Sequence, residues 1–376
     1  MINIFDKKEC CGCSACFQKC PRKCISMVMD EEGFSYPIVE SANCIDCHVC
    51  EKVCPILNRQ NPQKPISCYA AINTNVEIHR KSSSGGIFTL IGENIINSGG
   101  VVFGASFNKD WVVEHSFSET VVGLSKFRGS KYVQSDISEC YSKVEMFLKK
   151  GRIVLFSGTP CQIAGLKSFL IIEYENLITL DFICHGVPSP EVFKRYLHEN
   201  FYFRNIKDIS FRYKKYSNGY GFCVLCEDGE FYSDNSDNPY LKGFSHNLYL
   251  RPSCHDCKFK CLSSGSDITL ADFWRVDKIH PQYKGKNGVS CIILNTEKGY
   301  QLCKPNIKEW TISDITFVEK YNSSINKSTP LTNRRHQFFS QWKNVDLVLL
   351  INLLTKISFC QKLKSLVSII YRKIHP

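Results

Sequence analysis

The sequence predicts an α+β protein in which a small cysteine-rich domain precedes a larger, layered α/β domain. Two observations support this prediction. One cysteine spacing occurs twice within residues 1–57, and segments with strand and helix periodicity alternate between residues 99 and 200, as βαβ units require. The mostly polar stretch 58–66 contains two prolines and no apolar periodicity, so we expect a linker between the two parts.

The repeated spacing is typical of a bacterial ferredoxin with two [4Fe–4S] clusters. The two copies are Cys10-x2-Cys13-x2-Cys16-x3-Cys20-Pro21 and Cys44-x2-Cys47-x2-Cys50-x3-Cys54-Pro55. In this pattern, three cysteines wrap one corner of a cluster, and the fourth, followed by proline, reaches the other cluster. The expected ligand sets are therefore crossed: Cys10, Cys13, Cys16 and Cys54 for one cluster, and Cys20, Cys44, Cys47 and Cys50 for the other.

A pair of structural zinc sites is the alternative for these cysteines, since zinc also uses C-x2-C pairs. Zinc does not require a third and a fourth cysteine at fixed spacing with a following proline, so the cluster interpretation is favoured. Residues 25–29 and 34–39 flank Glu32-Gly33 and predict a hairpin over the clusters. Cys11 and Cys24 lie outside the pattern and are predicted to be packing residues.

Composition narrows the function classes. The chain has 376 residues and 22 cysteines, and it begins without the apolar run of an export signal. This cysteine content favours metal binding in a reducing cytoplasm over disulfides. Three clusters, each carrying −2 with its thiolates, would reduce the formal charge of +11 to about +5. We therefore do not expect nucleic acid as a partner.

Within residues 67–335, the pattern predicts the elements of the larger domain. The expected strands are 68–72, 101–107, 153–157, 177–183, 268–273 and 289–294. The expected helices are 87–97, 138–149, 162–169 and 191–200. Residues 205–250 are expected to be antiparallel, with turns at Asn218-Gly219 and Asp228-Gly229. Residues 336–376 predict a basic helical tail whose apolar run, 345–354, is too short to span a bilayer.

Five motifs occur in order in this part of the chain. They are Ser82-Ser83-Ser84-Gly85-Gly86, Gly129-Ser130-Lys131-Tyr132-Val133, Phe156-Ser157-Gly158-Thr159-Pro160-Cys161-Gln162, Cys184-His185-Gly186-Val187-Pro188 and Arg251-Pro252-Ser253-Cys254-His255-Asp256-Cys257. Together they resemble the coenzyme F420 hydrogenase/dehydrogenase beta-subunit family, which also contains hydroxymethyl-chlorophyll reductase. The resemblance runs from about residue 67 to 335.

The resemblance implies FAD (or FMN) as a cofactor. Ser84-Gly85-Gly86 opens a predicted helix, where free backbone N–H groups favour a phosphate, and Lys131 and Tyr132 can offer a charge and a ring. A plain helix N-cap, an exposed lysine and a half-buried tyrosine are the structural alternatives. Within the motifs we expect flavin contacts from Ser84, Gly85, Gly86, Ser130, Lys131, Tyr132, Gly158, Thr159 and Gln162.

The resemblance also implies a third [4Fe–4S] cluster, held by Cys161, Cys184, Cys254 and Cys257. Cys261 is a rival for Cys161, because C-x2-C-x3-C imitates half of a cluster motif. A zinc site is a further alternative. Cys223 and Cys226 share the C-x2-C spacing but lie in a predicted strand, where an odd offset places two side chains on opposite faces. They are predicted to be core residues.

The stretch 266–275 departs from the family motif, because Ser266, Ala271 and Arg275 stand where the family has glycine. Asp267 and Asp272 are candidate cofactor contacts, although these larger side chains argue against close backbone approach. No acid–base pair can be argued from spacing. His185 is a candidate only as the neighbour of Cys184, and a structural role is favoured for it.

The sequence therefore predicts a cytoplasmic iron–sulfur flavoprotein oxidoreductase. Electrons would pass from the ferredoxin clusters through a further cluster to a flavin, and on to an organic two-electron acceptor. Coenzyme F420 or a polysaccharide-pathway substrate is a possible acceptor, and an electron donor protein or redox subunit is the expected partner. An electron-transfer adaptor without its own substrate is the alternative function. The basic tail allows weak peripheral membrane association.

Overall fold

The computed structural model describes residues 1–214 and 219–356. The strands are β1 (Ile25–Met29), β2 (Ser35–Val39), β3 (Ser67–Ala71), β4 (Val101–Phe107), β5 (Val113–Ser118), β6 (Val154–Ser157), β7 (Leu177–Phe182), β8 (Ile206–Tyr213), β9 (Gly221–Cys226), β10 (Gly229–Asp234), β11 (Ile268–Asp272), β12 (Ser290–Leu294) and β13 (Trp310–Ser313). The helices are α1 (Ala15–Lys19), α2 (Val49–Lys52), α3 (Val76–Lys81), α4 (Ile87–Asn97), α5 (Cys140–Lys149), α6 (Pro160–Leu170), α7 (Pro190–Phe201), α8 (Pro239–Ser245), α9 (Glu297–Asn306), α10 (Ile315–Tyr321), α11 (Asn333–Gln341) and α12 (Leu347–Thr355).

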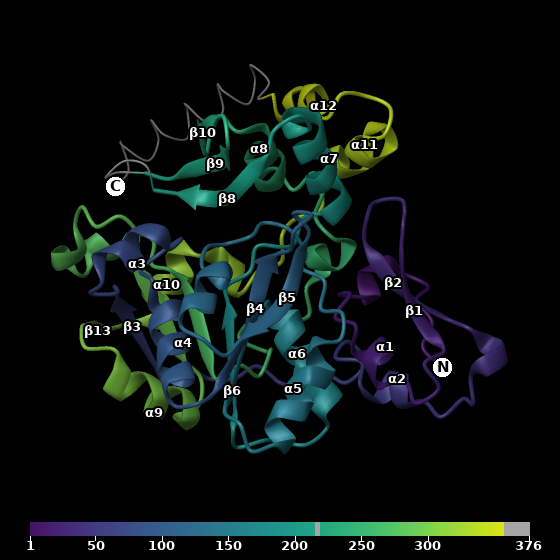
Figure 1. Ribbon diagram of the computed structural model, residues 1–376, viewed down its shortest axis with the longest axis horizontal. Helices are drawn as coiled ribbons and strands as arrows, with labels where there is room; N and C mark the ends of the chain where they lie inside the picture. Colours follow the sequence, from purple (N-terminus) through teal and green to yellow (C-terminus); the bar gives the residue numbers. More distant parts are fainter. Residues whose placement is uncertain (215–218, 357–376) are drawn as a thin grey trace.

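A mixed sheet of eight strands, in the order β13-β3-β12-β11-β7-β6-β4-β5, forms the centre of the molecule (Figure 1). Its middle strands β11, β7, β6 and β4 are parallel, and antiparallel strands flank them on both sides. Of these, β4, β6 and β7 are mostly buried, as expected where helices cover both faces. The fold is therefore mixed α and β with one large sheet, which agrees with the predicted α+β class.

Alternation along β4 and β6 divides the side chains between two cores. Phe103 and Phe156 pack with helices α5 and α6, whereas Val102 and Leu155 pack with α4 and α9 on the other face. Part of the N-terminal module joins the first of these cores, through Cys11, Cys13, Ala15, Val53 and Ile56. The module is thus packed against the α5 and α6 side of the sheet.

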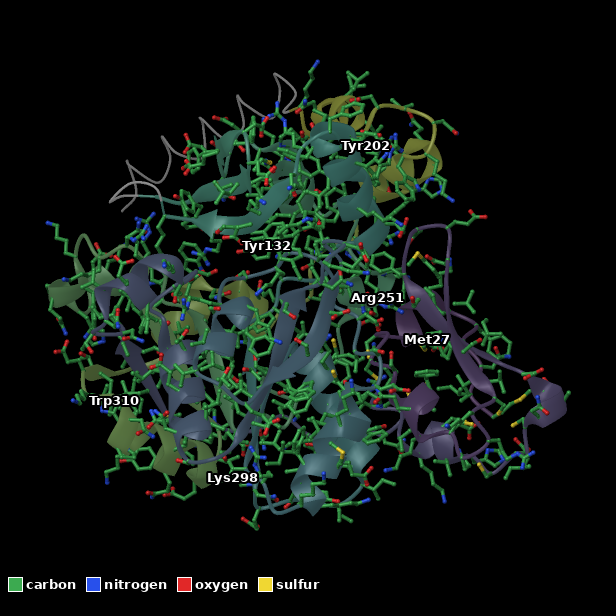
Figure 2. The ribbon with its side chains drawn as sticks, in the orientation of Figure 1. Met27, Tyr132, Tyr202, Arg251, Lys298 and Trp310 are labelled. Carbon is green, nitrogen blue, oxygen red and sulfur yellow. The ribbon has the colours of Figure 1, made fainter. Side chains whose placement is uncertain are left out.

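A second layer lies above the large sheet in Figure 1. It contains the antiparallel sheet β10-β9-β8 with helices α7, α8, α11 and α12. Tyr132 is seen between this layer and the large sheet, and Arg251 at the junction with the N-terminal module (Figure 2).

The six strands and four helices expected from periodicity are confirmed, as are the β1–β2 hairpin and the antiparallel region. The turn between β9 and β10 consists of Glu227 and Asp228, one residue earlier than predicted, because Gly229 already pairs with Cys226. Helix α6 begins at Pro160, two residues earlier than predicted, because the Gln162 Oε1 accepts a bond from Thr159 N (2.9 Å) and proline suits the first helical position. Cys223 and Cys226 are buried in β9, as expected of core residues.

The apolar run 345–354 forms most of α12, whose Leu347, Leu350 and Ile351 are buried against the second layer. None of the helices in the described ranges is long and apolar enough to cross a membrane. Residues 357–376 of the expected basic tail and Asn218 of an expected turn lie outside the described residues. The division of the chain after residues 57, 66 and 335 stays a prediction.

Candidate functional site

Five cysteines of the N-terminal module line one small cavity. Four are the predicted ligands Cys10, Cys13, Cys16 and Cys54, and the fifth is Cys11. Gly12 (φ +70°) and Ser14 (φ 61°) both have left-handed backbone conformations, and these bend the first three cysteines around the cavity. Cys54 arrives from the second copy of the repeat, after α2. This is the grouping that the crossed assignment expects.

The remaining cysteines of the repeat surround a second cavity. They are Cys20, Cys44, Cys47 and Cys50. His48 (φ 56°) occupies the position equivalent to Ser14 and has the same left-handed conformation, so the repeated spacing gives a repeated backbone. Cys24 also lines this cavity, with its Sγ 3.5 Å from that of Cys20. Cys24 is therefore a neighbour of the site, which the spacing alone did not indicate.

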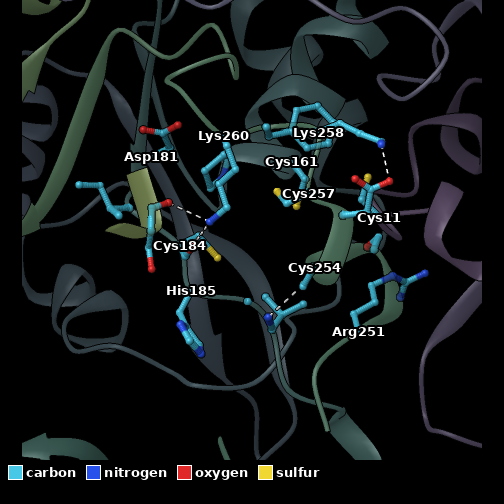
Figure 3. A pocket seen from close by; sticks show the side chains of 18 of the residues that line it. Cys11, Cys161, Asp181, Cys184, His185, Arg251, Cys254, Cys257, Lys258 and Lys260 are labelled. Atoms are coloured by element: carbon cyan, nitrogen blue, oxygen red, sulfur yellow. Dashed lines mark hydrogen bonds and ion pairs between the residues drawn. The ribbon is translucent and has the colours of Figure 1, made fainter. Parts of the chain in front are cut away.

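A third cavity lies where β6 and β7 end, and it is lined by Cys161, Cys184, Cys254 and Cys257 (Figure 3). Cys161 is in the first turn of α6, Cys184 follows the end of β7, and the other two belong to the loop at the 3-10 helix Pro252–Asp256. Cys11 lines the same cavity. Cys261, the predicted rival of Cys161, is exposed and does not line it.

Burial controls the protonation of these thiols. It raises the pKa of Cys254 to about 12 and that of Cys184 well above its usual range, because a thiolate is poorly stabilised away from water. For Cys161, the hydrogen bond with Cys11 is the largest cause of a raised pKa, followed by burial. A bound metal would deprotonate these thiols.

The donor chemistry at all three cavities fits an iron–sulfur cluster. Each is lined by the four cysteines predicted as its ligands and by one further cysteine, and such clusters are held by four thiolates. Within residues 1–214 and 219–356, no three His, Cys, Asp or Glu side chains are arranged to hold a single metal ion.

A larger cavity of about 470 Å³ lies between the large sheet and the second layer, within the range of small-molecule sites. Eight of the nine predicted flavin contacts line it: Ser84, Gly86, Ser130, Lys131, Tyr132, Gly158, Thr159 and Gln162. Gly85 does not. A Cβ there would lie 2.5 Å from the Ala71 oxygen and 2.7 Å from Ser290 N, so this glycine permits close packing of the chain.

The cavity suits an anionic cofactor. Helix α4 begins at Ile87 on its wall, and a helix N-terminus favours a phosphate. Arg128, Lys131 and Arg212 add basic groups to the lining. Tyr132 offers an aromatic face, although its ring already stacks on Phe244 at 4.7 Å between centroids.

The two aspartates of the stretch 266–275, which departs from the family motif, lie in different environments. Asp272 lines the large cavity and forms an ion pair with Arg212. Asp267 is buried away from the cavity and accepts bonds from Thr179 N and Oγ1 (2.8 and 2.7 Å) and from Thr296 Oγ1 (2.7 Å). It therefore connects strands of the sheet, while Asp272 is the candidate for cofactor contact.

One residue of the cavity wall, His115, gave no signal in the sequence. Its Nδ1 lies 2.9 Å from Ser135 Oγ, and its Nε2 lies 3.0 Å from the Ser157 backbone oxygen. Gln162 Nε2 also donates a hydrogen bond to Ser135 Oγ (2.9 Å). Burial lowers the pKa of His115 to about 4. A neutral ring that donates from Nε2 and accepts at Nδ1 satisfies this network.

The third cysteine cavity and the large cavity share a wall. Residues 182–187, which contain Cys184 and His185, line both. His185 Nε2 lies 2.7 Å from Asn247 Oδ1, and its backbone oxygen accepts a bond from Thr329 Oγ1. The imidazole is thus held by structural contacts, and the candidate cluster site adjoins the candidate cofactor site.

A protein with cysteine-lined cavities beside a cavity for an anionic cofactor has the features of a redox protein. A comparison with protein families supports this class: residues 151–316 match the family described as the C-terminal part of the coenzyme F420 hydrogenase/dehydrogenase beta subunit. This part of the chain is therefore similar to the beta subunits of that family. It contains all four predicted ligands of the third cavity, Cys161, Cys184, Cys254 and Cys257.

Among solved structures, the chain is similar to one titled "Xenon derivatization of the F420-reducing [NiFe] hydrogenase complex from Methanosarcina barkeri". The identity is 18%, the match covers 70% of this chain and 90% of that one, and the TM-score is 0.48. A comparison with curated proteins found no match.

Proposed function

We propose that this protein is an iron–sulfur flavoprotein oxidoreductase that passes electrons to an organic two-electron acceptor. Residues 1–57 form a ferredoxin domain with two [4Fe–4S] clusters, residues 67–335 hold a third cluster and FAD or FMN, and residues 336–376 form a basic tail. The clusters carry single electrons and the flavin combines two for the acceptor.

The observation that carries this proposal is the wall shared by two cavities. Residues 182–187 separate the site of Cys161, Cys184, Cys254 and Cys257 from the cavity lined by the flavin-type motifs. One cluster ligand, Cys184, belongs to this wall. An electron that leaves the cluster would therefore cross a single protein segment to reach the flavin.

The chain's own residues have separate tasks in this scheme. The cysteine sets would hold the clusters, and the cysteines of the third site are partly buried. Ser84, Gly86 and the start of α4 bind the phosphate end of the flavin, and Arg128 and Lys131 neutralise its charge. His115, held neutral, keeps a fixed pattern of hydrogen bonds at the wall.

The acceptor follows less directly from the residues. The description of the matched family names coenzyme F420 hydrogenase and dehydrogenase. Coenzyme F420 is therefore one candidate acceptor, and another redox subunit is the candidate partner. A polysaccharide-pathway substrate is the second candidate acceptor. The cytoplasm is the proposed location, and weak binding of the tail to membranes is part of the same proposal.

Analysis of protein purified without oxygen tests the proposal. We expect about twelve iron and twelve sulfide per chain and one flavin. A preparation with the clusters but no flavin, and no uptake of FAD or FMN, would favour the electron-transfer adaptor. A preparation in which zinc is the main bound metal would contradict the cluster assignment.

A further inference from the structure

Arg251 lies between the N-terminal module and the cavity of the third cysteine set, and it is 1% exposed (Figure 3). Its Nε donates to the Cys10 oxygen (2.8 Å), its Nη1 to Gln134 Oε1 (3.0 Å) and its Nη2 to the Ser35 oxygen (3.0 Å). The guanidinium also lies 4.3 Å from the centre of the Tyr36 ring. The side chain is therefore fixed in one position at the junction.

This buried cation forms no ion pair with a carboxylate in the part of the chain that the structure describes. Its oxygen partners are neutral, and neutral partners offset only part of the cost of burying a charge. A guanidinium stays charged at any relevant pH. The site therefore calls for a negative charge close by.

Two candidate anions flank the guanidinium. On one side, Nη2 lies 3.7 Å from Cys10 Sγ, a ligand of the proposed first ferredoxin cluster. On the other, Arg251 lines the cavity of Cys254, three residues along the chain. The two sites adjoin each other, because Cys11 and Ile56 line both cavities.

The packing around the guanidinium leaves little freedom. A Cβ at Gly12 would lie 2.7 Å from Arg251 Nη1 and 2.9 Å from Gln134 Nε2. Gln134 Nε2 in turn donates to the Cys11 oxygen (3.1 Å). The cluster loop, Gln134 and Arg251 therefore form one interlocked unit, and its only formal charge is the guanidinium.

We propose that Arg251 is the shared counter-charge of the two cluster sites that flank it and that it raises the reduction potential of both. The proposal rests on the clusters of the proposed function. When a cluster with four thiolates takes one electron from a donor, its net charge changes from −2 to −3, with no proton involved. A fixed positive charge close by stabilises the reduced form more than the oxidised form. Arg251 thereby favours electron uptake at the boundary between the two parts of the protein.

Potentiometric titration of the full-length holoprotein, followed by electron paramagnetic resonance, tests this role. Gln134→Glu places a carboxylate against the guanidinium and neutralises its field without removing it. At a fixed potential, we expect the ratio of reduced to oxidised cluster at both flanking sites to fall about tenfold, which corresponds to 59 mV for one electron. Gln134→Met removes the same hydrogen bonds without adding charge, so its potentials should stay at the wild-type values.

Two variants of Arg251 complete the set. Arg251→Met should lower both potentials in the same direction as Gln134→Glu, and Arg251→Lys, which keeps the charge, should restore most of the difference. The cluster of Cys20, Cys44, Cys47 and Cys50 does not adjoin Arg251 and should shift least. If Arg251→Met does not load its clusters, Gln134→Glu alone decides the question.

The two levels of proposal fail differently. Wild-type protein without clusters would refute the proposed function. Fully loaded Gln134→Glu protein with unchanged potentials, or equal shifts in Gln134→Glu and Gln134→Met, would refute the role of Arg251 and leave the cluster assignment intact.

Discussion

At the residue scale, the cysteine sites depend on where each fourth ligand comes from. Cys20 belongs to the first copy of the repeat but lines the cavity of Cys44, Cys47 and Cys50. Cys24 lies beside it, 3.5 Å away between the sulfur atoms, but it stands outside the repeated spacing. The distinction between these two thiols can be tested directly.

Cys20→Ser should remove the cluster of Cys44, Cys47 and Cys50 and leave that of Cys10, Cys13 and Cys16. We expect the iron content to fall from about twelve to about eight per chain, with a spectrum that matches Cys47→Ser protein. Cys24→Ser is the matched control and should keep its iron. A Cys20→Ser spectrum that matches Cys13→Ser protein instead would contradict the crossed assignment.

His115 gives a prediction about pH. Its pKa is about 4 in the folded protein because it is buried, against about 6.5 in an unfolded chain. Between these values the unfolded state binds more protons, so stability falls as the pH drops from 6.5 toward 4. The loss by pH 5 should be about 2 kcal/mol.

His115→Gln removes the titrating group and retains a polar side chain. The fall in melting temperature between pH 7 and pH 5 should therefore be smaller in this variant than in the wild type, measured by thermal unfolding without oxygen. Equal falls in the two proteins would mean that His115 titrates normally.

At the element scale, the β1–β2 hairpin shows how the N-terminal module is fixed to the rest of the chain. Glu32 at its tip accepts two bonds from the Arg335 guanidinium of α11, and its backbone oxygen accepts a bond from Ser189 Oγ (2.6 Å). Gly33 (φ +82°) has no room for a Cβ, which would lie 2.6 Å from Glu191 Cβ. The tip therefore fits one place between α7 and α11.

Arg335→Met should loosen this contact. The pair is largely buried, with side chains 10% and 21% exposed, so removing one partner should cost about 2 to 3 kcal/mol. We expect faster tryptic cleavage after Arg59, in the 58–66 segment, and faster hydrogen exchange in the hairpin. Lys7→Met breaks an ion pair of the same hairpin, with Asp30 at 2.6 Å, in which the lysine is 51% exposed. This control should change cleavage little.

The elements also show what a sequence can predict. Local patterns were sufficient for the cysteine loops and for most strands and helices, because the spacing or periodicity that marks each of them lies within the element itself. The contacts that unite the molecule join distant residues: Arg335 and Glu32 are 303 positions apart, and Arg251 and Cys10 are 241 apart. No periodicity or spacing connects such residues. The roles of His115, Arg251 and Arg335 are therefore evident only in the folded chain.

At the scale of the whole molecule, the sites form a sequence of neighbours. The cavity of Cys10, Cys13, Cys16 and Cys54 adjoins the third cysteine cavity through Cys11, and that cavity shares a wall with the large one. Electrons that enter at the N-terminal module would therefore pass the third cluster before they reach the flavin. This order of sites can be tested, because an enzyme would pass electrons internally to its flavin, whereas an adaptor would have no such internal path.

Cys257→Ser should interrupt the path at its middle step. The proposed ferredoxin clusters have ligands other than Cys257, so dithionite should still reduce them at the wild-type rate. Flavin should remain bound, since Cys257 does not line the large cavity, but its reduction by the clusters should slow by orders of magnitude in stopped-flow absorbance. Cys261→Ser is the matched control, because Cys261 is exposed and outside the third cavity, and it should behave as the wild type. If the flavin of Cys257→Ser protein is reduced at the wild-type rate, the third site is structural and electrons reach the flavin by another way.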